Sequence, residues 1–236
     1  MRYVKTLRTV GIIVAFAAAV CVGMLMNSQR VGAWDDDDRF QSEESRILRG
    51  FEIAPVPLNL AGKNLALVGF GSYIVNAVAD CNGCHSAGPM TEFTASGNPY
   101  FRIPPFSGQK KINGATYLGG GRDFGPVGSV LHLYSRNLTP DITGLPIGGR
   151  TYEEFTEIMR HGTDLDHIHP NCVAPGSPAN CFEPPFNGDL LQVMRWPFFK
   201  DMTDHELRAI YEYLSAVPCN PGQVIENAAY LQNTCK

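Results

Sequence analysis

The sequence predicts an all-α fold in which a few helices are joined by long irregular loops. Two stretches read Thr-x-x-Glu and are each followed by apolar residues at helical spacing, the pattern of a capped amphipathic helix. Helix-breaking residues fill much of the rest, with 24 Gly and 17 Pro among 236 residues. At 44% hydrophobic and 18% charged, the composition is that of a protein with a real core.

The first 33 residues have the layout of an export signal. Basic residues precede an apolar run of 17 residues, Val10–Met26, and Val31-Gly32-Ala33 is a small-residue cleavage site. We therefore expect a signal peptide over 1–33, cleavage near Ala33 and a periplasmic protein. Retention of the run as a membrane anchor is the alternative, because 17 residues is the lower limit for spanning a bilayer.

Residues 34–62 are expected to form an N-terminal extension. Its four consecutive Asp residues indicate a solvated chain end. Pro55 and Pro57 predict an extended strap over residues 40–62. A helix over 63–80 should follow, and its glycines, Gly69 and Gly71, predict a close approach by the last helix.

That helix leads into Cys81-Asn82-Gly83-Cys84-His85, a C-x-x-C-H motif that is the attachment signature of haem c. Two thiols at this spacing can form thioethers with the two vinyl groups on one side of a porphyrin. The next residue, His85, can then offer an imidazole nitrogen to the iron. A redox dithiol and half of a zinc site are the alternatives, but the sequence offers neither a thioredoxin-like context nor a second pair of ligands.

The stretch 86–135 is rich in Gly, Pro and aromatic residues and has no persistent period. A loop of this length is usually functional, and we expect it to wrap an edge of the haem. The run Gly119–Gly121 is not a phosphate loop, because it lacks the following Lys-Ser/Thr and a preceding strand.

Two helices follow from their N-caps. Thr151 begins a helix that stops at Gly162, and Thr203 begins the last helix, which ends before Pro218. The inward residues of the two helices are predicted to be Phe155, Ile158 and Met159, and then Leu207, Ile210, Tyr211 and Leu214. Between the helices, a polar loop is expected, with a second metal site as the alternative; it contains Asp164, Asp166, His167 and His169.

Cysteine usage agrees with export. Of seven cysteines, one lies in the signal and two in the haem motif, which leaves an even number for disulfides in an oxidising compartment. Three pairings are possible. We expect Cys172–Cys181 and Cys219–Cys235, because each closes a short local loop, and the second would tether a C-terminal tail, residues 219–236.

The sixth iron ligand must come from far along the chain to reach the opposite haem face. Met194 is the leading candidate, because it lies in an irregular segment that can lay a side chain on the haem. Met202 adjoins a helix cap and is expected to pack there instead. A His ligand and an open site are the remaining alternatives.

From about residue 63 to 218 the chain resembles a monohaem cytochrome c of the mitochondrial-cytochrome-like class, in a bacterial group with a long Gly-rich insertion after the haem motif. The matching pieces are the motif at 81–85, Ser135-Arg136-Asn137-Leu138-Thr139-Pro140-Asp141, Met194-Arg195-Trp196-Pro197, and 202–214.

The resemblance implies a cytochrome c domain over 63–218, with its first and last helices crossing at right angles beside one covalently bound haem c. It implies thioethers at Cys81 and Cys84, His85 and Met194 as axial ligands, and Arg136, Asn137 and Trp196 as neighbours of the propionates. The family usually has Pro after the distal Met, where this chain has Arg195.

The leading functional hypothesis is a periplasmic carrier of single electrons between redox proteins, and not an enzyme. The alternatives are a haem subunit of a periplasmic dehydrogenase complex, and a haem sensor or peroxidase with an open site. Removing 1–33 leaves 15 Lys and Arg against 23 Asp and Glu, a net charge of −8. That charge argues against nucleic acid and anionic lipid and suits a partner with a basic docking face.

Overall fold

The computed structural model describes residues 36–101, 110–174, 180–226 and 228–236, so the predicted signal peptide lies outside the described residues. The chain divides between Glu44 and Ser45 into two units. The structure is about 36% helical. Pairing of extended segments within the described ranges is limited to isolated bridges, such as Asp123 with Tyr134. No helix in those ranges is both long enough and apolar enough to cross a membrane.

Helix α2 (Asp36–Ile53) shows that the prediction of an extended strap over 40–62 was wrong for its first half. No proline interrupts the stretch before Pro55, and extended backbone begins only after Ile53. From Ser45 onward α2 belongs to the larger unit, where Ile47 and Phe51 pack onto a helical glycine, Gly69. The remaining strap is tied down by the Asn59 amide, which donates to the Ala216 carbonyl oxygen at 2.8 Å.

Helix α3 (Leu65–Tyr73) and the π-helical turn η1 (Ile74–Val78) form the predicted helix before the C-x-x-C-H motif. Asn64 caps α3 by accepting a hydrogen bond from the Leu67 amide at 3.3 Å. The two glycines serve different neighbours. A Cβ on Gly71 would lie 1.9 Å from the Ala209 carbonyl oxygen of α8, as predicted, whereas Gly69 faces α2.

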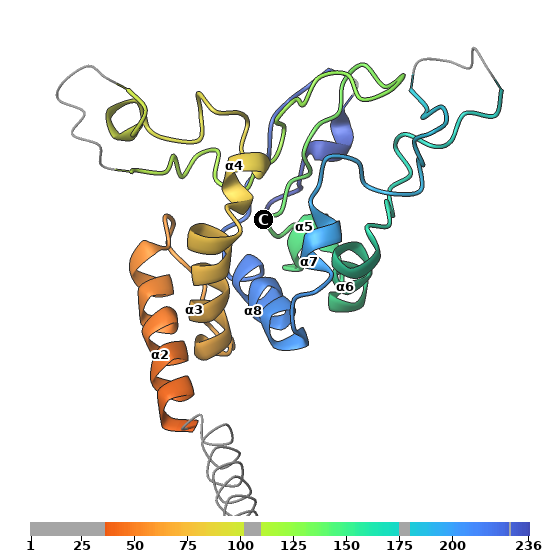
Figure 1. The fold of residues 1–236 in the computed structure, drawn as a ribbon. Coiled ribbons are helices and arrows are strands. Elements are labelled where there is room, and N and C mark those ends of the chain that lie inside the picture. The colour runs from red at the N-terminus through yellow and green to blue at the C-terminus, as the bar shows by residue number, and fades with distance from the viewer. Residues whose placement is uncertain (1–35, 102–109, 175–179, 227) are drawn as a thin grey trace, which may run out of the picture. The chain divides into compact units, whose positions relative to one another are not determined.

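Helices α6 (Tyr152–His161) and α8 (Asp204–Leu214) begin at Thr151 and Thr203, each with both hydrogen bonds of a capping box. Gly162 ends α6 in the left-handed conformation, as predicted. Figure 1 shows α8 beside α3, with α6 on the other side of α8. The shorter elements are α4 (Cys81–His85), η2 (Ala95–Gly97), α5 (Pro146–Gly149), α7 (Trp196–Phe199) and η3 (Ala229–Leu231).

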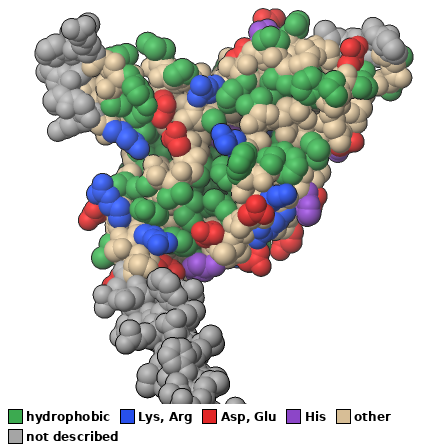
Figure 2. Space-filling view, in the orientation of Figure 1, with side chains coloured by type: hydrophobic (Ala, Val, Ile, Leu, Met, Phe, Trp, Pro, Cys, Tyr) green, Lys and Arg blue, Asp and Glu red, His purple; other side chains and the backbone are tan. Residues whose placement is uncertain are grey.

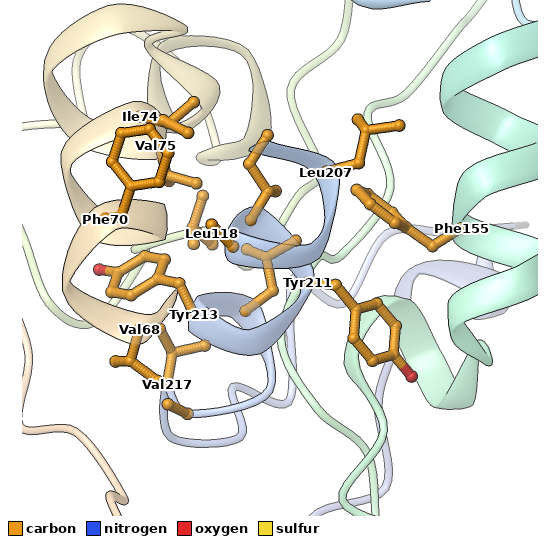
Figure 3. Packing of buried hydrophobic residues seen from close by; sticks show 14 of the residues in the cluster. Val68, Phe70, Ile74, Val75, Leu118, Phe155, Leu207, Tyr211, Tyr213 and Val217 are labelled. Atoms are coloured by element: carbon orange, nitrogen blue, oxygen red, sulfur yellow. The ribbon is translucent and has the colours of Figure 1, made fainter. Parts of the chain in front are cut away.

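The core lies along α8, where this helix packs against α3 on one side and α6 on the other (Figure 3). Tyr117 and Leu118, from the long loop over residues 86–135, complete it. All four inward residues predicted for α8 are buried there. In α6, Phe155 and Met159 are buried, and Ile158 is half-buried. The apolar stripes of both helices therefore face the core, as their helical spacing predicted.

A buried polar chain crosses this core. The Tyr117 and Tyr213 hydroxyls lie 2.7 Å apart, and Tyr117 also donates to Asn76 Oδ1 at 2.7 Å. Asn76 Nδ2 donates to the Ser72 carbonyl oxygen, and Ser72 Oγ donates to the Gly50 carbonyl oxygen of α2. Burial raises the pKa of both phenols, so they stay neutral, and the chain of bonds joins α2, α3, α8 and the long loop.

Replacing Tyr213 by Phe should lower the free energy of unfolding by about 1 kcal/mol, because one hydrogen-bonding hydroxyl is removed from a buried network. Denaturant unfolding measures the change. Tyr100→Phe is the matched control, because Tyr100 is 84% exposed; we expect a change within about 0.5 kcal/mol. Equal effects of the two substitutions would contradict a stabilising role for the network.

Two disulfides join Cys172 to Cys181 and Cys219 to Cys235, the pairing expected from the short loops. The first closes the long loop after α6, and the second ties the C-terminal tail to the end of the α8 segment. Cys81 and Cys84 carry free thiols. The four cysteines outside the C-x-x-C-H motif are therefore paired, and the two inside it are not, as the sequence predicted.

Candidate functional site

Helix α4 carries the C-x-x-C-H motif to the wall of a cavity. Asp80 adopts the left-handed conformation (φ 47°) and turns the chain from η1 into α4; Asp is among the residues that tolerate this region. A Cβ at Gly83 would lie 2.5 Å from the Asp80 carboxylate, so a side chain there would require the Asp80 side chain to move. Cys81, Cys84 and His85 all line the cavity.

The Gly-rich stretch of the long loop holds α4 in place. The Leu118 amide donates to Asn82 Oδ1 at 2.9 Å, and the Gly120 amide donates to the His85 carbonyl oxygen at 2.8 Å. Arg122 also donates to the Gly83 carbonyl oxygen. Gly120 has φ +70°, and a Cβ there would lie 2.6 Å from the Arg136 backbone. The glycines thus let the loop fit between the motif and the segment that contains Arg136.

His85 is held as a metal-binding tautomer. Its Nδ1 lies 2.7 Å from the Arg136 carbonyl oxygen, which can only accept, so Nδ1 carries the proton. Burial, the largest cause, lowers the pKa of His85, which keeps the ring neutral. The Nε2 lone pair is consequently free for a ligand bond, the arrangement in which a backbone carbonyl fixes a ligating histidine.

The Cys81 thiol is in a setting that opposes redox activity. Burial, with smaller effects of Asp80 and Cys84, raises its pKa to about 12. Redox-active C-x-x-C motifs instead have lowered thiol pKa values, because the thiolate is the nucleophile. The raised pKa therefore argues against a redox dithiol at Cys81. Among the described residues, no group of three or more His, Cys, Asp or Glu could hold a metal ion.

The cavity has a volume of about 190 Å³ and is partly open to solvent. Its walls are mainly apolar, and Figure 2 shows hydrophobic side chains gathered between α4 and α6–α7, with basic side chains among them. Contributing side chains come from the long loop and from helices α6, α7 and α8, and include Leu133, Leu138, Phe155, Leu191, Phe199 and Leu214. Such walls suit the apolar body of a ligand.

Three methionines line this cavity. Met194, the predicted distal ligand, lies in the irregular segment before α7 and packs against the core. Val193 before it has φ +55°, which turns the chain at this point. Met202 and Met159 line the same space. Sequence reasoning considered Met202 but treated Met159 only as an inward residue of α6.

One corner of the cavity is charged. Arg136 Nε lies 3.0 Å from Asp166 Oδ2, and Arg136 Nη2 lies 3.4 Å from Asp164 Oδ1. Arg150 pairs with Asp166, and the Arg136 guanidinium lies 4.7 Å from the Tyr230 ring centre. Arg136, Arg150 and both aspartates line the cavity. The Asp residues of the loop after α6 therefore serve in ion pairs, which fits the polar-loop prediction.

Two of the predicted propionate neighbours are not among the lining residues. Asn137 is 5% exposed, accepts hydrogen bonds from the Thr139 amide and hydroxyl, and donates to the Asn220 carbonyl oxygen at 2.9 Å. Trp196 donates from Nε1 to the Leu191 carbonyl oxygen at 3.1 Å, and its ring covers Gly162. In this structure both side chains hold loop backbone, and their contact with propionates stays a prediction.

The sequence analysis missed Arg150 and assigned His169 to a polar loop, with a second metal site as the alternative, although both residues line the cavity. No local pattern marks them, since Arg150 merely precedes a capping box and His169 precedes a proline.

No protein-family model matches the chain, and neither the curated proteins nor the solved structures that were searched contain a match.

Proposed function

We propose that this chain is a periplasmic monohaem c-type cytochrome with a cytochrome c fold, which carries single electrons between redox proteins. In this proposal Cys81 and Cys84 would hold haem c through thioethers, and His85 and Met194 would be the ligands of its iron. The bound haem would supply one-electron chemistry by cycling between Fe(III) and Fe(II).

One observation carries the proposal. Two free thiols and a histidine with an available Nε2 lie on one wall of a cavity whose other walls are apolar and include methionines. These groups meet the needs of a covalently attached haem: two points of attachment, one nitrogen ligand, a thioether, and a dry surrounding.

The chain's own residues would tune the site in three ways. The Arg136 carbonyl fixes the orientation of His85. The apolar walls exclude water, which keeps the response of the surroundings to a change of charge small. A thioether ligand from Met194 would favour the reduced iron relative to a second histidine.

Two further features support export. Four of the six cysteines after the signal form disulfides, which persist in oxidising compartments. The signal layout of residues 1–33 points to the same compartment, although those residues lie outside the described ranges.

The Met194→Ala variant tests the proposal through absorption spectra of the oxidised and reduced protein, with and without carbon monoxide. The wild type should not bind carbon monoxide and should show a sulfur-to-iron charge-transfer band. The variant should lose that band and bind carbon monoxide at one equivalent per haem, because the sixth position is then open.

Met90→Ala is the matched control, since Met90 is 73% exposed and does not line the cavity; it should behave as wild type. Met202→Ala and Met159→Ala separate the three methionines of the cavity. Ready binding of carbon monoxide by the wild type would overturn the carrier proposal and favour a sensor or enzyme.

A further inference from the structure

His169 is a buried histidine whose ring has no hydrogen-bond partner among the described residues. It is 4% exposed, and neither Nδ1 nor Nε2 is bonded. Asn180 is close enough for its backbone and side chain to act on the pKa of His169, but it makes no well-aligned hydrogen bond to the ring, and its Nδ2 donates to the Ile168 carbonyl oxygen at 3.3 Å. Buried polar groups are nearly always paired, so an imidazole without a partner calls for one from outside the described chain.

The segment that carries His169 is firmly held. The Phe182 amide donates to the Pro170 carbonyl oxygen at 2.8 Å, and the Cys172 amide donates to the Phe182 carbonyl oxygen at 2.9 Å. The Cys172–Cys181 disulfide closes this loop, and the Phe182 ring stands edge-on to the His169 ring at 5.9 Å. The histidine is thus kept inside by its surroundings and does not depend on a polar contact of its own.

His169 lines the same cavity as the C-x-x-C-H motif. Burial lowers its pKa, so the ring is neutral and has one N–H to donate. Arg136 and Asp164 line the same cavity as His169, and both also act on that pKa. The two ring orientations related by a half-turn of χ2 have the same shape, so an acceptor in the cavity can select the one that directs a nitrogen toward it.

A ligand that fits this cavity has carboxylates at one edge of an apolar body. The cavity offers the guanidinium of Arg136, the guanidinium of Arg150 and the imidazole of His169, while the remaining walls are mainly apolar. Both guanidinium groups are already engaged by aspartates, whereas the His169 ring is not. The hydrogen-bond donor that remains available to an incoming carboxylate is therefore the His169 ring N–H.

Building on the proposed function, we propose that His169 donates a hydrogen bond to a propionate of the covalently bound haem and so acts as a positioning residue at its polar edge. A propionate charge favours the ferric form, and a hydrogen bond that partly neutralises this charge favours the ferrous form. His169 would therefore raise the reduction potential without touching the iron.

The test compares His169→Leu, which removes the donor, with His169→Gln, which keeps one. Both variants are prepared as full-length holoprotein, and mass spectrometry first verifies that each carries covalent haem. At the wild-type midpoint potential, the ratio of reduced to oxidised protein should fall about threefold in His169→Leu and stay within about twofold of wild type in His169→Gln. His132→Leu is the control, because His132 is exposed and outside the cavity.

Two spectra separate this role from other roles. The redox-difference infrared spectrum should show a propionate carboxylate band that moves in His169→Leu and not in His132→Leu. The sulfur-to-iron band should persist in both. Loss of that band in His169→Leu would mean that His169 bears on the iron ligation itself, and an unmoved potential with an unmoved carboxylate band would mean that no such bond exists; either result overturns the inference.

A measurement on the wild type covers the case in which His169→Leu does not fold. In the reduced, diamagnetic protein, proton–nitrogen NMR should show a slowly exchanging His169 ring N–H with through-space contacts to the propionate methylene protons. Absence of these contacts would refute the bond. Absence of covalent haem in the wild type would refute the proposed function and the inference together. Attached haem without contacts between the His169 ring N–H and the propionate protons would refute the inference alone.

Discussion

Replacing both Cys81 and Cys84 by Ala should abolish covalent haem attachment completely. Both thiols are free and line the cavity, and a non-covalent haem would be held only by axial ligation and apolar contact. The intact mass should then equal that of the bare mature chain, and acidified organic solvent should extract any bound haem. The two single variants should each retain one thioether, which the reduced pyridine spectrum reports as a band shift relative to wild type.

The control removes another cysteine pair. Cys219→Ala with Cys235→Ala opens a disulfide that spans 16 positions and should lower the free energy of unfolding by about 3 kcal/mol. The same variant should keep its full covalent haem. Haem that resists extraction from the Cys81/Cys84 double variant would contradict the assignment of the motif.

Replacing Gly71 by Leu should destabilise the fold by about 3 kcal/mol or more, with insoluble protein as the extreme result. A Cβ at this position would lie 1.9 Å from the Ala209 carbonyl oxygen and 2.5 Å from its carbon, so the clash is with backbone that side-chain rotation cannot relieve. Helices α3 and α8 would have to separate at their crossing (Figure 3). Denaturant unfolding, followed by helical circular dichroism, measures the loss.

Gly114→Ala is the matched glycine control. A Cβ there meets only Val56 Cγ1, at 3.4 Å, so the neighbour can accommodate it. We expect a change within about 0.5 kcal/mol. A Gly71→Leu variant as stable as wild type would show that α3 and α8 do not approach closely at this point.

Local patterns predicted the starts of α6 and α8 and the cysteine pairs correctly. Thr151 and Thr203 each bond to a residue three positions on, so the capping signal is contained in four letters of sequence. The disulfides join cysteines that are 9 and 16 positions apart, and this short separation along the chain favours the observed pairing. The turn that presents the C-x-x-C-H motif is local in the same sense.

Helix α2 shows why local reasoning failed elsewhere. Its apolar pair, Ile47 and Phe51, is too narrow a stripe to predict a packed helix by itself. The partner is Gly69, where the missing side chain makes room for both. Gly69 and Gly71 look alike in sequence, yet each receives a different helix, because residues two apart point to different sides of a helix.

The sequence by itself determined the position of the C-x-x-C-H motif, the two capped helices and the disulfide pairs, because the residues involved lie close together in the chain. Only the tertiary structure decided what surrounds the motif. Arg136 meets Asp164 across 28 positions, and Tyr117 meets Tyr213 across 96. Contacts over such separations depend on how the chain closes its loops, and no short pattern encodes them. For that reason the charged corner and the place of His169 in the cavity emerged from the fold, whereas His85 was evident from its place after Cys84.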